Sequence, residues 1–204
     1  MRVLVCVKQV PEVTNVQVNP ETGTLNRDGV ASILNPFCEY AMDLALDLKA
    51  TNEDVEIVVL TMGPPQARMA LMRCLEMGAD RAILVTDRKF AGADTWATAL
   101  TIAKMVEKLD GVDLVLVGKH AIDGDTAQVG PQTAQRLGIP SVTYVQKIRE
   151  IKDGSVIVER NLEDGFEVIE VKTPCLLTAI KELNDPRYMS IAQIEDAYKK
   201  EITI

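Results

Sequence analysis

The chain has 204 residues, of which 47% are hydrophobic and 25% charged, so wholesale disorder is excluded and one domain, with or without an arm, is expected. Lys and Arg total 22 against 30 Asp and Glu, and the net charge of −8 disfavours general binding to DNA or RNA. No apolar run approaches a membrane span, and the first residues lack the pattern of a signal peptide. Four scattered cysteines and a single histidine disfavour a zinc site and are typical of reduced thiols, so we expect a cytoplasmic protein without a metal.

Short apolar segments alternate with amphipathic ones along the first two thirds of the chain. Buried parallel strands are predicted where the segments are apolar on both faces, at residues 3–7, 57–60, 83–85 and 114–117. Helices are predicted where apolar residues recur at helical spacing, at residues 39–49, 65–77, 95–109 and 128–137. An early hairpin is predicted over residues 12–28. This alternation predicts an α/β fold with a doubly wound, mostly parallel sheet.

The last third of the chain changes to an antiparallel pattern. Strands are predicted at residues 142–148, 156–160 and 166–172, with Asp153-Gly154 and Asp164-Gly165 as the turns. A further strand at 176–180 returns to the sheet, and a short polar helix is predicted over 191–199. We therefore expect a nucleotide-binding α/β domain over residues 1–183, which includes a small antiparallel portion, and a C-terminal arm over residues 184–204.

The loop after the strand at 114–117 is the most informative segment, because open parallel sheets bind ligands at the carboxyl ends of their strands. Its residues are Gly118, Lys119, His120, Ala121, Ile122, Asp123, Gly124, Asp125, Thr126, Ala127, Gln128 and Val129, followed by Gly130. Gly124 and Gly130 let the backbone approach a ligand, while Thr126, Gln128 and the amides at the helix start suit a pyrophosphate. In the alternative interpretation, which stays open, the loop's Asp and Thr residues only cap the next helix.

Other candidate residues are weaker. A lone His120 predicts a hydrogen-bonding or packing role, and Cys38 and Cys74 are expected to be buried as small hydrophobes. Asp123 and Asp125 alone are weak evidence for a metal. The chain has neither GxGxxG nor GxxxxGK[ST], and no Ser, His and acid set is apparent. The residues thus predict a nucleotide site without catalytic side chains, and whether the protein is an enzyme stays open.

Six segments in this order resemble the beta subunit of an electron transfer flavoprotein. They are Val7-Lys8-Gln9-Val10-Pro11, Asn35-Pro36-Phe37-Cys38-Glu39, Met62-Gly63-Pro64, Met77-Gly78-Ala79-Asp80, Ala121 through Pro131, and Asp185-Pro186-Arg187-Tyr188. The resemblance extends from residue 1 to about 200, and it implies an adenine nucleotide alpha hydrolase-like fold. A nucleotide hydrolase or a nucleotide sensor of similar fold is a distant alternative. The absence of a P-loop and of a catalytic triad disfavours the hydrolase.

The resemblance implies a heterodimer with an alpha subunit that holds a further FAD. Simple members hold AMP in the beta subunit, whereas bifurcating members hold FAD there, take hydride from NADH and pass electrons to a ferredoxin or flavodoxin and to a dehydrogenase. Residues 61–67, 87–95 and 123–126 resemble the bifurcating type. FAD in the beta site is therefore favoured. The alternative is that the beta site binds AMP structurally, in a subunit that serves assembly and dehydrogenase docking.

The resemblance also implies roles for individual residues. Nucleotide contacts are implied for Cys6, Asn35, Pro36, Phe37, Cys38, Met62 and the residues from Gly118 to Val129, with Asp94 and Thr95 at the flavin. A loop that docks onto an acyl-CoA dehydrogenase or a similar dehydrogenase is implied for Arg187, Tyr188, Met189, Ser190 and Ile191. Ile191 stands where the family has an apolar anchor.

Overall fold

A computed structural model of the protein describes residues 1–12, 31–52, 54–184 and 187–204, so the hairpin predicted over 12–28 lies almost wholly outside the described residues. The strands are β1 (Arg2–Cys6), β2 (Gln9–Pro11), β3 (Ser32–Leu34), β4 (Glu56–Met62), β5 (Arg81–Val85), β6 (Leu114–Gly118), β7 (Ser141–Lys152), β8 (Ser155–Leu162), β9 (Gly165–Lys172), β10 (Cys175–Ala179) and β11 (Ile202–Thr203). The helices are α1 (Pro36–Thr51), α2 (Arg68–Met77), α3 (Thr95–Leu109), α4 (Val129–Leu137) and α5 (Ile191–Ala197).

The main sheet has nine strands in the order β11-β5-β4-β1-β6-β10-β7-β8-β9. The strands from β11 to β7 run parallel, and β8 and β9 extend the sheet in antiparallel fashion. The chain moves outward from β1 through β4 to β5, then crosses to the other side of β1 at β6. This reversal confirms the predicted doubly wound α/β fold, and it places the carboxyl ends of β1, β4 and β6 at one edge.

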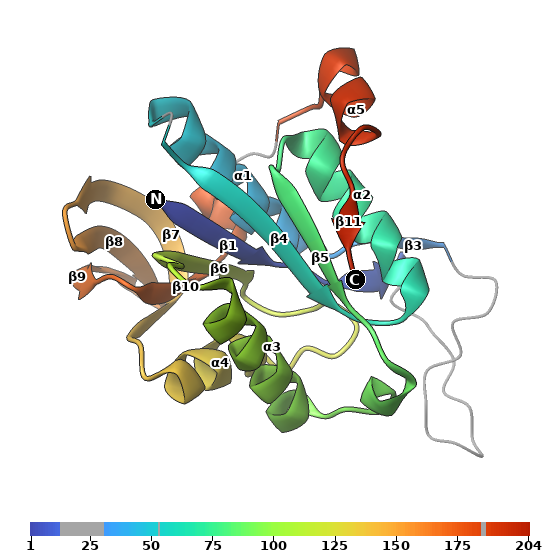
Figure 1. The fold of residues 1–204 in the computed structure, drawn as a ribbon. Coiled ribbons are helices and arrows are strands. Elements are labelled where there is room, and N and C mark those ends of the chain that lie inside the picture. The colour runs from blue at the N-terminus through green and yellow to red at the C-terminus, as the bar shows by residue number, and fades with distance from the viewer. Residues whose placement is uncertain (13–30, 53, 185–186) are drawn as a thin grey trace.

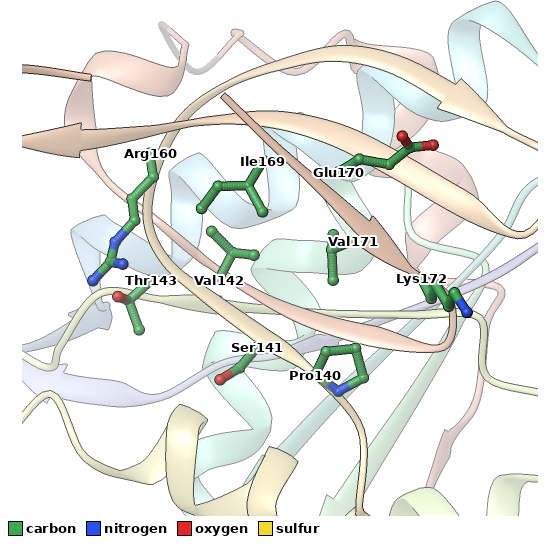
Figure 2. A pocket seen from close by; sticks show the side chains of 9 residues that line it. All are labelled: Pro140, Ser141, Val142, Thr143, Arg160, Ile169, Glu170, Val171 and Lys172. Carbon is green, nitrogen blue, oxygen red and sulfur yellow. The ribbon is translucent and has the colours of Figure 1, made fainter. Parts of the chain in front are cut away.

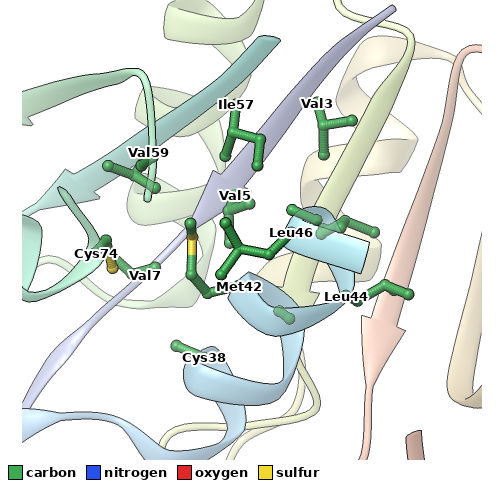
Figure 3. Close-up of a cluster of buried hydrophobic side chains, with 14 of the residues drawn as sticks. Val3, Val5, Val7, Cys38, Met42, Leu44, Leu46, Ile57, Val59 and Cys74 are labelled. Carbon is green, nitrogen blue, oxygen red and sulfur yellow. The ribbon is translucent and has the colours of Figure 1, made fainter. Parts of the chain in front are cut away.

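Helices cover both faces of the parallel part of the sheet (Figure 1). On one face, α1 and α2 pack against the strand residues Val3, Val5, Ile57 and Val59, as Figure 3 shows. The alternate strand residues, Leu4, Val58 and Leu60 among them, pack against α3 and α4 on the other face. Both faces of each central strand are buried, which is why these strands are apolar throughout rather than alternating. Each fully buried aliphatic side chain contributes about 1.5–3 kcal/mol.

Several predicted boundaries differ from the observed ones. Helix α1 begins at Pro36 rather than at residue 39, because proline suits the first turn of a helix. Pro65 lies in a 3₁₀ turn that precedes α2. The second antiparallel turn is formed by residues 163–164, and Gly165 already belongs to β9. Strand β11 was not predicted, because two residues are too few to form a recognisable strand pattern.

Among the described residues, no helix is long and apolar enough to cross a membrane.

Candidate nucleotide-binding site

The loop between β6 and α4, residues 118–129, lies at the edge where the central parallel strands end. Cys6, near the end of β1, pairs in register with Leu60 of β4 and with Val117 of β6. Lys8, just beyond β1, forms a 2.7 Å ion pair with the carboxylate of Asp123, whose side chain is 6% exposed. The structure thus brings the segment after β1 and the 118–129 loop together, as the strand-end argument predicts.

The loop is held from the start of α1. The side chain of Asn35 donates from Nδ2 to the carbonyl of His120 at 2.8 Å and accepts from the amide of Ile122 at 3.1 Å. The ring of Phe37 contacts the His120 ring edge-on, with 4.5 Å between centroids. His120 Nδ1 lies 2.7 Å from Oδ1 of Asp125. The prediction that His120 packs and hydrogen-bonds is therefore confirmed.

The backbone of the loop is strained where it is exposed. Asp125 and Ala127 have φ values of 47° and 53°, in the left-handed region that residues other than glycine rarely adopt. Gly124, Asp125, Thr126 and Gln128 are exposed. Strained backbone of this kind persists only where its surroundings hold it, and it is concentrated at binding sites.

Two glycines of this region allow close packing between elements. A Cβ atom at Gly118 would lie 2.8 Å from the carbonyl carbon of Phe37, so only glycine permits this approach of β6 and α1. A Cβ atom at Gly130 would lie 2.8 Å from Cγ2 of Val117, so Gly130 seats α4 on the sheet. Gly124 has open space around its Cα.

The amino end of α4 has no side-chain cap. Its N-cap residue is Gln128, whose side chain makes no capping hydrogen bond. The alternative interpretation, that the loop's Asp and Thr residues cap this helix, is therefore not supported. The first amides of a helix have no partner within it and carry partial positive charge, which favours an anion. Helix α3 differs, because Asp94 caps it by accepting from the amide of Ala97 at 2.8 Å.

The amino ends of α3 and α4 are joined by a polar cluster. The Thr95 hydroxyl donates to Oε1 of Gln128 at 3.1 Å, and Nε2 of Gln132 donates to both residues at 3.3–3.4 Å. Thr95, and Asp94 beside it, are thus linked to the 118–129 loop. The sequence reasoning missed Gln132. The available signal was its position four residues after Gln128, which places the two side chains on one face of α4.

The cysteines near this edge are buried. Burial raises the pKa of Cys6 to about 12 and also raises the pKa of Cys38. Both thiols therefore stay protonated at neutral pH and are poor nucleophiles. The prediction that Cys38 and Cys74 are buried is confirmed. Met62 is the last residue of β4 and lies at the same edge of the sheet. The described residues contain no cluster of three or more side chains that could hold a metal ion.

The predicted docking residues divide into those that face the protein and those that face solvent. Nε of Arg187 lies 2.8 Å from a carboxylate oxygen of Asp43, whose side chain is 3% exposed, and Arg187 also contacts Asp47. Met189 accepts a hydrogen bond from Arg73, and Ser190 caps α5. Tyr188 and Ile191, in contrast, are 100% and 86% exposed.

Two cavities lie elsewhere on the molecule. The first, of about 530 Å³, lies along β7, β8 and β9 and is drawn in Figure 2. The second, of about 550 Å³, lies between α1 and β7. Neither is lined by residues of the 118–129 loop. The candidate site is thus described by the 118–129 loop itself and not by either of these cavities.

Comparison with known proteins identifies the family. The family described as "Electron transfer flavoprotein domain" matches residues 22–204. The chain belongs to the electron transfer flavoprotein family. This agrees with the resemblance stated above, and the α/β fold found here is consistent with it.

Several curated relatives of this electron transfer flavoprotein chain match it over nearly its whole length. It is 59% identical over 204 residues to "Caffeyl-CoA reductase-Etf complex subunit CarD" of Acetobacterium woodii, covering 100% of the chain and 78% of the relative. It is 54% identical over 202 residues to "Electron transfer flavoprotein subunit beta" of Clostridium acetobutylicum, covering 99% and 77%. It is 46% identical over 208 residues to "Acryloyl-CoA reductase electron transfer subunit gamma" of Anaerotignum propionicum, covering 100% and 77%. These relatives confirm the resemblance to the beta subunit.

Proposed function

We propose that this beta subunit binds FAD at the 118–129 loop and passes electrons from NADH or an acyl-CoA-type dehydrogenase to a partner, as in flavin-based electron bifurcation. The observation that carries the proposal is the loop itself, held by Asn35 and Phe37 and leading into an uncapped α4. FAD, when bound, supplies the hydride and one-electron chemistry, and the protein supplies binding and orientation.

The residues present fit the phosphates of a nucleotide. Val129 and Gly130 lie in the first turn of α4, where amides face outward without helical partners. Thr126 and Gln128 are exposed beside them and offer a hydroxyl and an amide. Lys8 neutralises the nearby Asp123, which lowers the repulsion that a buried carboxylate would exert on a phosphate.

The link between α3 and α4 favours FAD over AMP. A dinucleotide needs contacts beyond its adenylate half, and the Thr95–Gln128 hydrogen bond brings the start of α3 next to the 118–129 loop. The similarity to a subunit of a caffeyl-CoA reductase-Etf complex supports the same choice. The alternative is AMP bound structurally, in a subunit that serves assembly and docking.

The partners proposed are an electron transfer flavoprotein alpha subunit carrying a further FAD, a dehydrogenase of the acyl-CoA type, and a ferredoxin or flavodoxin. We assign the dehydrogenase to the C-terminal arm, residues 184–204, as a docking unit appended to the nucleotide-binding domain at 1–183. Tyr188 and Ile191 are its contact residues, because they project from a segment that Arg187 holds against α1. A cytoplasmic location is proposed for the complex.

The test is an absorption spectrum of the chain purified with its alpha subunit, followed by extraction and counting of nucleotides. We expect two FAD per heterodimer and bleaching of the flavin absorbance by NADH. One FAD with one AMP would overturn the bifurcating proposal and support the alternative. Absence of both nucleotides would overturn the nucleotide site altogether. A variant with Gly130 replaced by Leu, which displaces α4, should lose the beta-site nucleotide and retain the alpha-subunit FAD.

A further inference from the structure

We infer that Asn35 is a positioning residue, which shapes the 118–129 loop before a ligand arrives and does not itself touch the nucleotide. The inference rests on the proposed function only for the identity of the ligand. The role of Asn35 is inferred from its hydrogen bonds and its burial in the folded chain.

Every polar atom of Asn35 already has a partner within the protein. Its amide donates to the carbonyl of Lys8 at 2.9 Å, and its carbonyl accepts from the amide of Cys38 at 2.8 Å. The side-chain oxygen accepts from Ile122, and the side-chain nitrogen donates to His120 and to the sulfur of Cys38. Asn35 is 1% exposed. No donor of this residue is left for a ligand, and almost none of its surface is accessible to one.

The position of Asn35 makes this use of its side chain informative. It is the N-cap residue of α1, where asparagine is favoured because its side chain accepts from the first amides of the helix. Its side chain makes no such capping bond to the α1 backbone amides. It reaches instead across 85 and 87 residues of sequence, to His120 and Ile122. The Asn35 side chain thus makes long-range hydrogen bonds to the loop in place of the local capping bond that its position favours. Such departures from local preference are expected at functional sites.

The two contacts fix both edges of one short stretch of the loop. With the carbonyl of His120 and the amide of Ile122 held, the chain enters the exposed stretch with a set direction. The left-handed residues Asp125 and Ala127 follow within five residues. Strained backbone of this kind needs an external constraint. The Asn35 side chain supplies one, and the Phe37–Gly118 contact supplies a second.

The test compares Asn35→Leu and Asn35→Asp with Leu44→Ala, in the full chain purified with its alpha subunit and freed of nucleotide. Leu is close to Asn in size and removes both side-chain bonds to the loop, whereas Asp keeps an acceptor for the Ile122 amide. Leu44 is buried in α1 away from the loop, so Leu44→Ala is a control for general loosening of the helix. Hydrogen exchange is followed at the loop amides and at β1 and β4, and FAD and AMP affinities are measured separately.

For Asn35→Leu we expect exchange at the amides of residues 119–129 to accelerate about 10- to 100-fold, with β1 and β4 unchanged, because buried loop groups lose their partner. We expect Asn35→Asp to restore protection at Ile122 in part, and both variants to bind nucleotide more weakly. Unchanged loop exchange in both variants with weaker nucleotide binding would overturn the inference, because a contact residue acts only when the ligand is bound. Acceleration throughout the sheet, as for Leu44→Ala, would also overturn it. If the parent protein binds neither FAD nor AMP, the proposed function fails, while the loop exchange still decides the role of Asn35.

Discussion

The 118–129 loop and residues 187–190, which lead into α5 of the C-terminal arm, are irregular segments that both contact α1, but the balance of forces that holds them differs. The loop is held mainly by neutral hydrogen bonds from Asn35 and by ring and backbone packing around Phe37. Asp123 of the loop, whose side chain is 6% exposed, also forms an ion pair with Lys8. Residues 187–190 are held on α1 by the ion pairs of Arg187 with Asp43 and Asp47, whereas the later part of the arm packs through α5 on α2 and pairs through β11 with β5. Neutral buried bonds are insensitive to salt, whereas partly exposed ion pairs are screened by it.

This difference suits the roles proposed for the two segments. A nucleotide site needs loop atoms fixed to within a fraction of an ångström, and close packing with saturated hydrogen bonds provides that. A docking segment needs only to present its apolar side chains, here Tyr188 and Ile191, and an ion-paired anchor allows adjustment. The comparison therefore predicts that substitutions in the loop act on nucleotide binding, and that substitutions in the arm act on partner docking.

The largest effect is expected at Gly118. A methyl group there would collide with the backbone of Phe37, so Gly118→Ala should lower the free energy of unfolding by about 3 kcal/mol and cause loss of the beta-site nucleotide. Denaturant unfolding and nucleotide analysis measure the two effects. Gly124→Ala is the matched control, because its new methyl group meets nothing within 4 Å, and its unfolding free energy should stay within about 0.5 kcal/mol of the parent's. Equal effects at the two positions would break the comparison.

A smaller effect is expected from Arg187→Ala. The substitution leaves the 3% exposed carboxylate of Asp43 without its cation. We expect the free energy of unfolding to fall by about 2 kcal/mol, below the value for a fully buried pair because Arg187 is 44% exposed. The double variant Arg187→Ala with Asp43→Asn should recover part of the loss. Beta-site nucleotide content should remain that of the parent, and its loss would contradict the division of roles.

Substitution of the exposed apolar side chain of the arm should separate docking from stability. Ile191→Ala is expected to change the free energy of unfolding by less than about 0.5 kcal/mol, since Ile191 is 86% exposed. The same variant should weaken dehydrogenase binding about tenfold or more, as removal of an interface anchor does. Binding assays with the dehydrogenase, beside Lys199→Ala as a charge control on the same arm, test this. Unchanged dehydrogenase binding would remove Ile191 from the interface.

The smallest effect concerns pH. A hydrogen bond from Lys200 lowers the pKa of Asp196 below its ordinary value of 3.8. The folded-state pKa is depressed, so this contact stabilises the arm above pH 3.8 and its contribution disappears as the pH falls through the lowered value. The protection of α5 amides against hydrogen exchange, measured relative to the intrinsic rate at each pH, should therefore fall on acidification before the protection of the 118–129 loop does. Asp196→Asn should remove this fall in protection, and a loop that loses protection first would reverse the comparison.

The sequence by itself determined most of the fold and the edge of the sheet at which the nucleotide site is proposed. Apolar runs predicted β1, β4, β5 and β6, because strands buried on both faces are apolar throughout. Helical spacing predicted α1 to α4, because a helix buried on one face repeats its apolar residues every three to four positions. Parallel strands joined by crossover helices end at the same edge of a sheet, so the edge that carries the 118–129 loop could be named in advance.

Only the tertiary structure decided how the loop and the arm are held. Asn35 has the sequence signature of a helix cap, yet its side chain binds a loop 87 residues away. Gly130 was expected to let the backbone approach a ligand, and the structure adds that a side chain there would collide with Val117. Arg187 was expected at a partner surface, and its guanidinium lies against Asp43, 144 residues away. Contacts across such separations leave no local pattern, because periodicity records only which face of an element is buried and never which partner its polar groups meet.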